Sequence, residues 1–480
     1  MIAKKKLSLT DAILIVSGSM IGSGIFIVSA DMARTVGGGG WLLLLWLISG
    51  VITVFAALSY GELAGMFPHA GGQYVYLREA FNPLVGFLYG WTLFVVVQSG
   101  TIAAVAVAFA KFAGVLYSPF SEKNILLDIG WLHVSAAQLV GMVSILILTM
   151  INSQGIHYGK WIVRIFSSAK IIALFGLILL GLFFFRNPAV WSANFADPWR
   201  MAQVIKNNDG NWVWNTLSTF GLITALGTAL VGSLFSSDAW NNVTFIAGDI
   251  EDPRKNIPLS LFFGTLIVTI LYMLANMAYL SLLPLVGDPN GADALAQGIQ
   301  FAANDRVGTA AATMIFGSTA TILMAVLIMV STFSCNNSIV LSSVRVYQAM
   351  AKDGLFFDRM QHDNKNGVPG FALWIQFIWS ALLCLSGHYG DLLDYVMFAV
   401  MLFYILTIAG IFILRNKQPD AERPYKAFGY PVIPIIYIVF ATLFCVNLLY
   451  TKPSNSIPGL LLVLLGIPVY YMWRGVKRRE

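Results

Sequence analysis

The stretch Gly18-Ser19-Met20-Ile21-Gly22-Ser23-Gly24-Ile25-Phe26 lies within an apolar run at residues 10–35. Its first seven residues contain three glycines and two serines, and each glycine costs a helix about 1 kcal/mol relative to alanine. Glycine also lets a ligand approach the backbone closely. A GxxxG contact between two helices, made by Gly18 and Gly22, is the alternative. On its own, this stretch leaves an interrupted helix and a packing contact equally open.

A second apolar run, residues 217–250, contains Gly232-Ser233-Leu234-Phe235-Ser236-Ser237-Asp238-Ala239-Trp240-Asn241-Asn242. Serine, aspartate and asparagine side chains compete with the hydrogen bonds of a helix. Asp238 lies roughly midway along the run, where an ionisable group is costly and is a functional candidate. The run is therefore predicted to be interrupted at a position that corresponds to the first stretch.

The composition places most of the chain in a bilayer. Of 480 residues, 58% are hydrophobic and 11% are charged, whereas soluble domains have about 25% charged residues. The apolar runs reach about 20 residues without strand-like alternation, so they are predicted to be membrane-spanning helices. We predict an all-α integral membrane protein of twelve spans, at residues 10–35, 41–66, 83–116, 131–152, 160–186, 217–250, 257–284, 308–345, 369–387, 393–414, 431–450 and 456–474.

The positions of the two weak stretches predict an internal repeat. They fall in the first and sixth spans, so each repeat has five helices, and an odd number of crossings inverts the second repeat. We assign the repeats to residues 1–190 and 217–414, helices 11 and 12 to 431–474, and a cytoplasmic tail to 475–480. Paired interrupted helices in inverted halves indicate a substrate site near the membrane midplane.

Charge and cysteine content agree with this topology. With both termini in the cytoplasm, most of the 29 lysine and arginine residues lie on the cytoplasmic side, as the positive-inside rule expects. A basic cytoplasmic face accounts for the net charge of +6 without a nucleic acid partner. The three cysteines, Cys335, Cys384 and Cys445, all lie in predicted helices, so the sequence indicates no disulfide framework.

The two interruptions predict a site for a zwitterion. The half-helix that follows Gly22–Gly24 would present free N–H groups to a carboxylate. Carbonyl groups released around Phe235–Asp238 would accept hydrogen bonds from an ammonium group. The expected solute is therefore small and organic, and most simply an amino acid.

Three further polar positions lie deep in predicted helices. Lys170 is too far from the end of its span to reach water easily, so it needs partners. We expect it to bridge the fifth helix to carbonyls of the broken first helix and to a hydroxyl of the eighth helix, that of Ser334; a purely structural tie is the alternative. Gln98 and Thr101 are expected to line the solute pathway, and ordinary contacts between helices would explain them equally well.

Several motifs are similar to those of one transporter family. They occur in order at Ile21–Phe26, at Pro68–Leu77 with Ala80–Pro83, at Asp252–Leu259, at Asn276–Tyr279 and at Ala351–Gly354. With these motifs the chain resembles the amino acid–polyamine–organocation superfamily, and within it the L-type amino acid transporters. The resemblance implies the inverted-repeat fold and alternating access.

The resemblance also implies roles for individual residues. The substrate carboxylate is expected at Ile21, Gly22, Ser23 and Gly24, and the amine at Phe235, Ser236 and Asp238. Lys170 stands where sodium-coupled relatives hold a cation, which implies sodium-independent transport. Many L-type members have a small residue in place of Asp238, so its carboxylate points to cationic substrates or to proton sensing.

The loop at residues 117–130 departs from the animal members of the family. It lacks the cysteine through which those members are linked to a glycoprotein subunit. We therefore expect no disulfide-linked partner at this loop, and a stand-alone protein of a bacterial inner membrane in contact with membrane lipids.

Among functional classes, we predict an amino acid exchanger, with a proton-coupled amino acid symporter as the alternative. A membrane enzyme is less well supported because the sequence has no HExxH motif and its five histidines lie in or near loops. A channel is less well supported because no repeated charged rings are visible. No cofactor or metal is expected.

Overall fold

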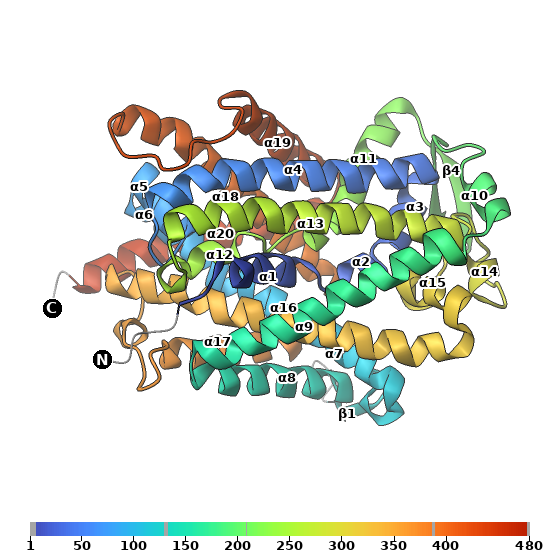
Figure 1. Ribbon diagram of the computed structural model, residues 1–480, viewed down its shortest axis with the longest axis horizontal. Coiled ribbons are helices and arrows are strands. Elements are labelled where there is room, and N and C mark those ends of the chain that lie inside the picture. Colours follow the sequence, from blue (N-terminus) through green and yellow to red (C-terminus); the bar gives the residue numbers. More distant parts are fainter. Residues whose placement is uncertain (1–5, 129–132, 208, 386–388, 478–480) are drawn as a thin grey trace.

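The protein is a bundle of long helices that run lengthwise in Figure 1. The computed structural model describes residues 6–128, 133–207, 209–385 and 389–477. The helices of the first half are α1 Leu9–Met20, α2 Gly24–Ile27, α3 Ser29–Val36, α4 Gly39–Met66, α5 Gln73–Ala80, α6 Pro83–Thr92, α7 Gln98–Leu116, α8 Ala136–Ser153, α9 Ile156–Leu179 and α10 Pro188–Asn194. A π-helical turn, η1 Leu93–Val97, joins α6 to α7.

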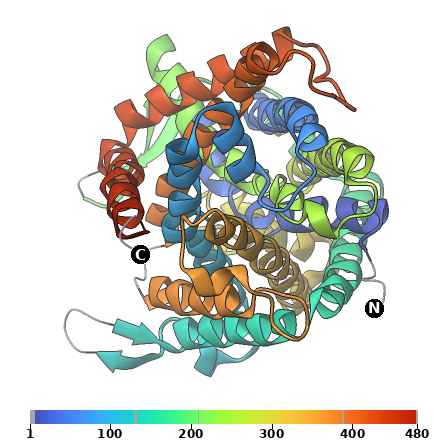
Figure 2. The same ribbon diagram turned by 90° about the vertical axis from the view of Figure 1, so that its left-hand side faces the viewer.

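The second half is also helical. Its helices are α11 Thr219–Ser236, α12 Asn242–Phe245, α13 Pro253–Leu282, α14 Ala294–Gln297, α15 Val307–Phe316, α16 Ala320–Lys352, α17 Gly370–Leu385, α18 Tyr389–Lys417, α19 Val432–Thr451 and α20 Pro453–Lys477. In Figure 2, which looks along the bundle, α19 and α20 (orange to red) lie at its edge. This position fits two helices added to a central set of ten.

Eleven of the twelve predicted spans are confirmed. Eleven helical segments of the described residues are long and apolar enough to cross a bilayer. The remaining predicted span, at residues 369–387, corresponds to α17, an apolar helix of 16 residues. The third predicted span matches the segment Pro83–Leu116 at both ends.

Both predicted interruptions are confirmed. The first helix ends at Met20 and resumes at Gly24, and the sixth ends at Ser236 and resumes at Asn242. The half-helix α1 packs against α12, and α2 packs against α11. The first half of one broken helix thus lies beside the second half of the other, which is the antiparallel arrangement that an inverted repeat produces. The repeat boundaries at residues 190 and 217 stay predictions.

Three local features differ from the sequence prediction. Two small antiparallel hairpins, β1 Ile125–Asp128 with β2 His133–Ser135 and β3 Ala202–Lys206 with β4 Trp212–Thr216, stand in the connections between helices. The connection between the second and third predicted spans, residues 67–82, contains a further helix, α5, whose residues are mostly buried. The helix α20 continues to Lys477, into the segment predicted as a tail, and residues 478–480 lie outside the described residues.

Candidate functional site

One buried lysine covers the carbonyl groups that the first interruption exposes. Lys170 on α9 is fully buried, and its Nζ donates to the carbonyl oxygens of Gly18 at 2.6 Å and Ile21 at 2.5 Å. The carbonyl oxygen of Ser331 on α16 lies 3.4 Å from the same Nζ. A charged donor makes a stronger hydrogen bond than a neutral one. Lys170 therefore ties α9 and α16 to the point where α1 ends.

The prediction that Lys170 contacts the Ser334 hydroxyl is wrong. The Ser334 hydroxyl lies 3.0 Å from the Ser167 hydroxyl instead. The hydroxyl that α16 offers to the interruption is that of Ser331, which donates to Ile21 at 3.0 Å and lies 3.2 Å from the carbonyl oxygen of Gly22. Because Ser331 precedes Ser334 by three residues, it occupies the neighbouring turn of α16.

The other side of the first interruption presents backbone N–H groups. Among the described residues, no acceptor is recorded for the N–H groups of Gly22, Ser23 and Gly24. The Ser23 side chain makes no capping bond to α2, and α2 runs on into α3 through the hydrogen bond from Val28 N to the Gly24 carbonyl. These N–H groups form the positive end of a helix of about three turns, which suits an anion.

The second interruption carries its own backbone strain and free carbonyls. Ala239 adopts a left-handed conformation with φ of 64°, which is uncommon for a residue other than glycine. The Phe235 carbonyl accepts from Asp238 N at 3.1 Å. No donor is recorded among the described residues for the carbonyls of Ser237 and Asp238. Acceptors are therefore concentrated here, opposite the donors of the first interruption.

The two interruptions are in direct contact. A Cβ atom placed on Gly24 would lie 2.9 Å from Cβ and 3.3 Å from Cα of Ser236, so only glycine fits there. The Tyr272 hydroxyl, from α13, lies 3.0 Å from the carbonyl oxygen of Met20 and 3.1 Å from that of Ser236. Tyr272 thus joins the ends of α1 and α11. No local sequence pattern predicts this role.

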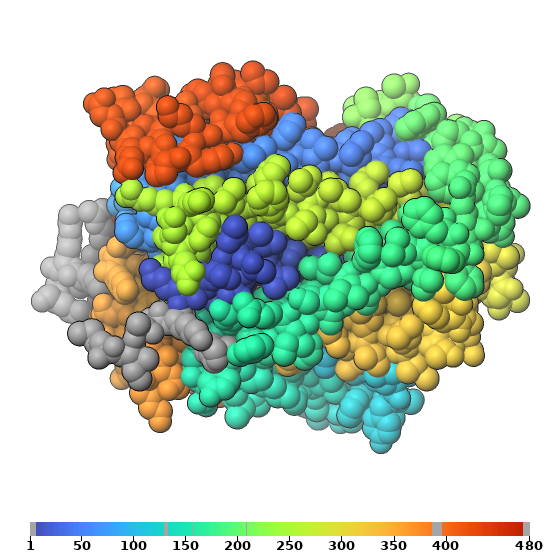
Figure 3. Space-filling model, viewed as in Figure 1, coloured from blue at the N-terminus to red at the C-terminus, as the bar shows by residue number. Residues whose placement is uncertain are grey.

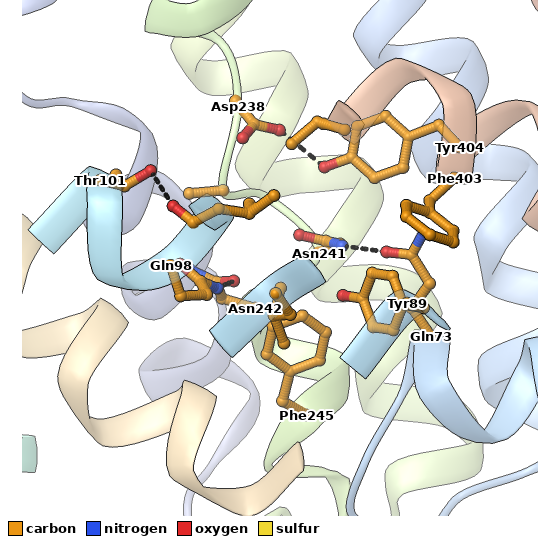
Figure 4. A pocket seen from close by; sticks show the side chains of 14 residues that line it. Gln73, Tyr89, Gln98, Thr101, Asp238, Asn241, Asn242, Phe245, Phe403 and Tyr404 are labelled. Atoms are coloured by element: carbon orange, nitrogen blue, oxygen red, sulfur yellow. Dashed lines mark hydrogen bonds between the residues drawn. The ribbon is translucent and has the colours of Figure 1, made fainter. Parts of the chain in front are cut away.

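A cavity lies beside the second interruption (Figure 4). It is lined by residues of α5, α6, α7, α12 and α18 and by the η1 turn: Gln73, Tyr89, Leu93, Val97, Gln98, Thr101, Asp238, Ala239, Asn241, Asn242, Phe245, Val400, Phe403 and Tyr404. Asp238, Gln98 and Thr101 were predicted for the site or its pathway, and the structure brings them together here. The other predicted residues, Ile21–Gly24, Phe235 and Ser236, do not line this cavity.

Hydrogen bonds fix most polar side chains of the cavity. The Tyr404 hydroxyl donates to Asp238 Oδ1 at 2.6 Å, and Figure 4 shows the two side chains pointing toward one another. Gln98 Nε2 donates to Asn242 Oδ1 at 2.8 Å. Asn242 Nδ2 finds no acceptor among the described residues, and a buried donor without a partner is costly. That N–H group is therefore a buried, unpaired donor on an amide that lines the cavity.

Two cavity residues could not be assigned from the sequence. Gln73 accepts from Asn241 Nδ2 at 2.8 Å and donates to Thr407 at 3.0 Å, which the burial of α5 makes possible. Tyr404 lies 166 residues from Asp238 along the chain. The π-helical turn at Leu93–Val97 also lies in this region. Such turns often occur at functional sites, but the sequence of this turn has no distinguishing pattern.

The family model for amino acid permeases matches residues 7–472. The chain belongs to the amino acid permease family. This permease is 28% identical over 477 residues to the large neutral amino acids transporter small subunit 2 of Mus musculus, covering 98% of this chain and 81% of that one. It is 28% identical over 480 residues to the serine/threonine exchanger SteT of Bacillus subtilis, covering 99% and 98%.

A third relative extends the similarity. The permease is 25% identical over 474 residues to the b(0,+)-type amino acid transporter 1 of Mus musculus, covering 98% of this chain and 88% of that one. The family match confirms the expected superfamily resemblance and makes this chain a multi-span membrane transporter of amino acids. The roles of individual site residues stay predictions.

Proposed function

We propose that this permease exchanges L-amino acids across the cell membrane by alternating access and without sodium. The observation that carries the sodium independence is the contact of Lys170 Nζ with the carbonyls of Gly18, Ile21 and Ser331. A fixed ammonium group already neutralises the oxygen atoms that a bound cation would need. Exchange is supported by the similarity to the serine/threonine exchanger SteT.

The substrate backbone is proposed to lie between the two interruptions. Its carboxylate would accept hydrogen bonds from the N–H groups of Gly22, Ser23 and Gly24, which have no acceptor among the described residues. Its ammonium group would donate to the carbonyls near Asp238. The close contact of Gly24 with Ser236 supports one shared site rather than two.

The cavity is proposed to receive the substrate side chain. Its walls combine the Asp238 carboxylate, the Asn242 amide and the Gln98 amide with aromatic rings. The free Asn242 Nδ2 would donate to a hydroxyl or carbonyl oxygen, and Asp238 would accept from a hydroxyl or a cationic group. We expect serine, threonine and asparagine to bind better than leucine or phenylalanine.

The proposed setting is a bacterial inner membrane, with both chain termini in the cytoplasm and no disulfide-linked subunit at residues 117–130. The absence of cysteine from that loop and the bacterial relative support this proposal. Transport without chemical change, rather than enzymatic turnover, is the proposed activity.

Proton-coupled symport is the second candidate, and the Asp238–Tyr404 contact at 2.6 Å favours it. A carboxylate that faces both a phenol and a solute cavity has the position of a proton-binding group. In that reading, a proton on Asp238 would travel with the substrate.

Uptake into proteoliposomes tests the proposal. Purified permease is reconstituted in sodium-free buffer, and uptake of radiolabelled serine is followed with and without unlabelled serine inside. We expect internal substrate to accelerate uptake and added sodium to have no effect. Equal rates with empty and preloaded vesicles under an imposed proton gradient would contradict exchange and support symport. Dependence on sodium would contradict the role of Lys170.

A further inference from the structure

A larger cavity lies at one end of the bundle, away from the interruptions. It measures about 1330 Å³, counting the open space at its mouth. Its walls come from α4, from the start of α13 and from the loop between α18 and α19, through Leu58, Asp252, Arg254, Lys255, Pro258, Leu259, Phe262, Pro424, Tyr425, Lys426 and Phe428. Figure 3 shows that loop (orange, upper left) beside the left ends of α4 and α13.

The apolar part of this cavity continues the membrane-facing surface. Leu58, Leu259 and Phe262 belong to segments that span the bilayer. Phe428, which also lines the cavity, is 66% exposed, and Val432, four residues further along the chain, is 60% exposed; both are large and apolar. Such a surface is stable only in contact with lipid chains or another apolar partner.

The polar part of the cavity is basic. Arg254, Lys255 and Lys426 all line it and are exposed. Arg254 is paired with Glu422 at 2.8 Å. No carboxylate among the described residues pairs with Lys255 or Lys426. Asp252 is the one acidic residue in the lining, so the net charge of the lining side chains is positive.

The wall formed by the α18–α19 loop is held firmly in place. Glu62 near the end of α4 accepts from Ala427 N at 2.7 Å and from Arg415 at 2.7 Å. Tyr425 packs over Gly61, where an added Cβ atom would lie 2.7 Å from its ring. The cavity is therefore a built feature between three elements rather than a gap beside a loose loop.

We propose that this cavity binds an anionic phospholipid, with the phosphate at Lys255 and Lys426 and an acyl chain along Leu58, Leu259 and Phe262. Two lysines without partners complement a phosphate, and basic cavities between spanning helices bind anionic headgroups. The apolar wall beneath them distinguishes a lipid from a soluble anion. With the termini cytoplasmic, the site faces the inner leaflet. It also gives a role to the Asp252–Leu259 motif, which the amino acid site does not use.

Native mass spectrometry of the full-length permease in detergent tests the site directly. Phosphatidylglycerol and phosphatidylcholine are titrated into the wild type and into the double variant Lys255→Ala, Lys426→Ala. We expect the wild type to prefer phosphatidylglycerol and the double variant to bind it about 25-fold more weakly, since each lysine near an anionic surface contributes about fivefold. The double variant Arg359→Ala, Lys365→Ala removes the same charge from exposed positions outside the cavity and should bind like the wild type.

Three results would overturn the proposal. They are equal binding of the two lipids to the wild type, an equal loss in the control variant, and displacement of bound lipid by millimolar inorganic phosphate, which would identify a site for soluble anions. Because the measurement uses no amino acid, its outcome is independent of the proposed exchange. A thermal unfolding curve like that of the wild type will confirm that the double variant is folded.

Discussion

At the residue scale, Lys170 is the buried side chain that depends most on its hydrogen-bond partners. A buried ammonium is stable only when it is paired or hydrogen-bonded, and Lys170 obtains its partners from carbonyls of Gly18 and Ile21 that the interruption has released. The lysine and the interruption thus stabilise each other. This mutual dependence explains why a charge and a helix break occur together in the middle of a bilayer.

Replacing Lys170 by methionine should abolish most transport. Methionine is one atom shorter than lysine and has no donor. It leaves the Gly18 carbonyl without a partner among the described residues, at about 1–3 kcal/mol, whereas Ile21 keeps its hydrogen bond from Ser331. We expect the exchange rate to fall at least tenfold, which corresponds to about 1.4 kcal/mol, and the protein to unfold at a lower temperature. Uptake assays and thermal unfolding measure both effects. The exposed Lys365→Met is the control, and full activity of Lys170→Met would contradict the assigned role.

Asp238 should control substrate preference. Its carboxylate lies in the cavity against Tyr404, so Asp238→Gly removes an acceptor from the side-chain pocket and frees the Tyr404 hydroxyl. We expect competition by serine and by cationic amino acids to weaken about tenfold relative to competition by alanine, as for the loss of one hydrogen bond to a charged group. A competition panel measures this ratio. An unchanged ranking would remove the Asp238 side chain from substrate recognition.

At the scale of elements, the two broken helices are fitted to one another with little space between them. Gly24 lies against Ser236, and Tyr272 from α13 touches the last carbonyls of both first halves. The contact with Ser236 explains why residue 24 is glycine. Packing does not explain Gly22, because a Cβ atom there would meet only Cys335 Sγ, at 3.6 Å.

These two glycines provide a matched pair of variants. Gly24→Ala should lower the free energy of unfolding by about 1–3 kcal/mol, as overpacking does, whereas Gly22→Ala should change it by less than about 0.5 kcal/mol. The additional change Ser236→Gly should restore part of the loss in Gly24→Ala, because the colliding side chain is removed. Unfolding in denaturant measures all three variants. Equal effects of the two single variants would contradict the observed contact.

The sequence predicts where helices are interrupted better than it predicts which side chains meet between helices. The glycines and serines near Gly22 and the serines and asparagines near Asp238 disfavour helix locally, so both interruptions could be located. Ser331 rather than Ser334 faces the first interruption because of the rotation of α16, which a pattern of small polar residues does not determine. Gln73 reaches the cavity only because α5 is buried by other helices.

At the scale of the whole molecule, ionic and backbone contacts connect the start of α1 to its neighbours at one end of the bundle. Buried Asp11 on α1 accepts from Lys160 at 2.6 Å and from Arg164 at 2.7 Å, both on α9. Leu7 pairs with Ile250 as an isolated β-bridge. The half-helix α1 is thereby held to both α9 and the segment after α12, and opening this end of the molecule requires these contacts to break.

Weakening these contacts should loosen the coupling of exchange. Asp11→Asn keeps the size of the side chain but removes the charge that holds Lys160 and Arg164. We expect uptake into empty vesicles to rise relative to preloaded ones, reducing their ratio about fivefold for a loss of about 1 kcal/mol. The ratio of the two initial rates is the measurement. A ratio equal to that of the wild type would show that these ion pairs do not limit return of the empty carrier.

The overall architecture could be predicted from the charge content and the apolar runs of the sequence. Low charge and long apolar runs predicted the spans, and two matching weak points predicted an antiparallel pair of broken helices. The hairpins β1–β2 and β3–β4 were not predicted because short strands in connections leave little periodic signal. The basic cavity could not be predicted because its lysines lie 171 positions apart in sequence and meet only when the α18–α19 loop folds over α4.

A density map of the permease with bound serine tests the central claim most directly. We predict the substrate carboxylate about 3 Å from the N–H groups of Ser23 and Gly24, the ammonium group against the carbonyls near Asp238, and the hydroxyl in the cavity beside Asn242. Serine bound elsewhere, with the N–H groups of residues 22–24 bonded to the protein itself, would contradict the account.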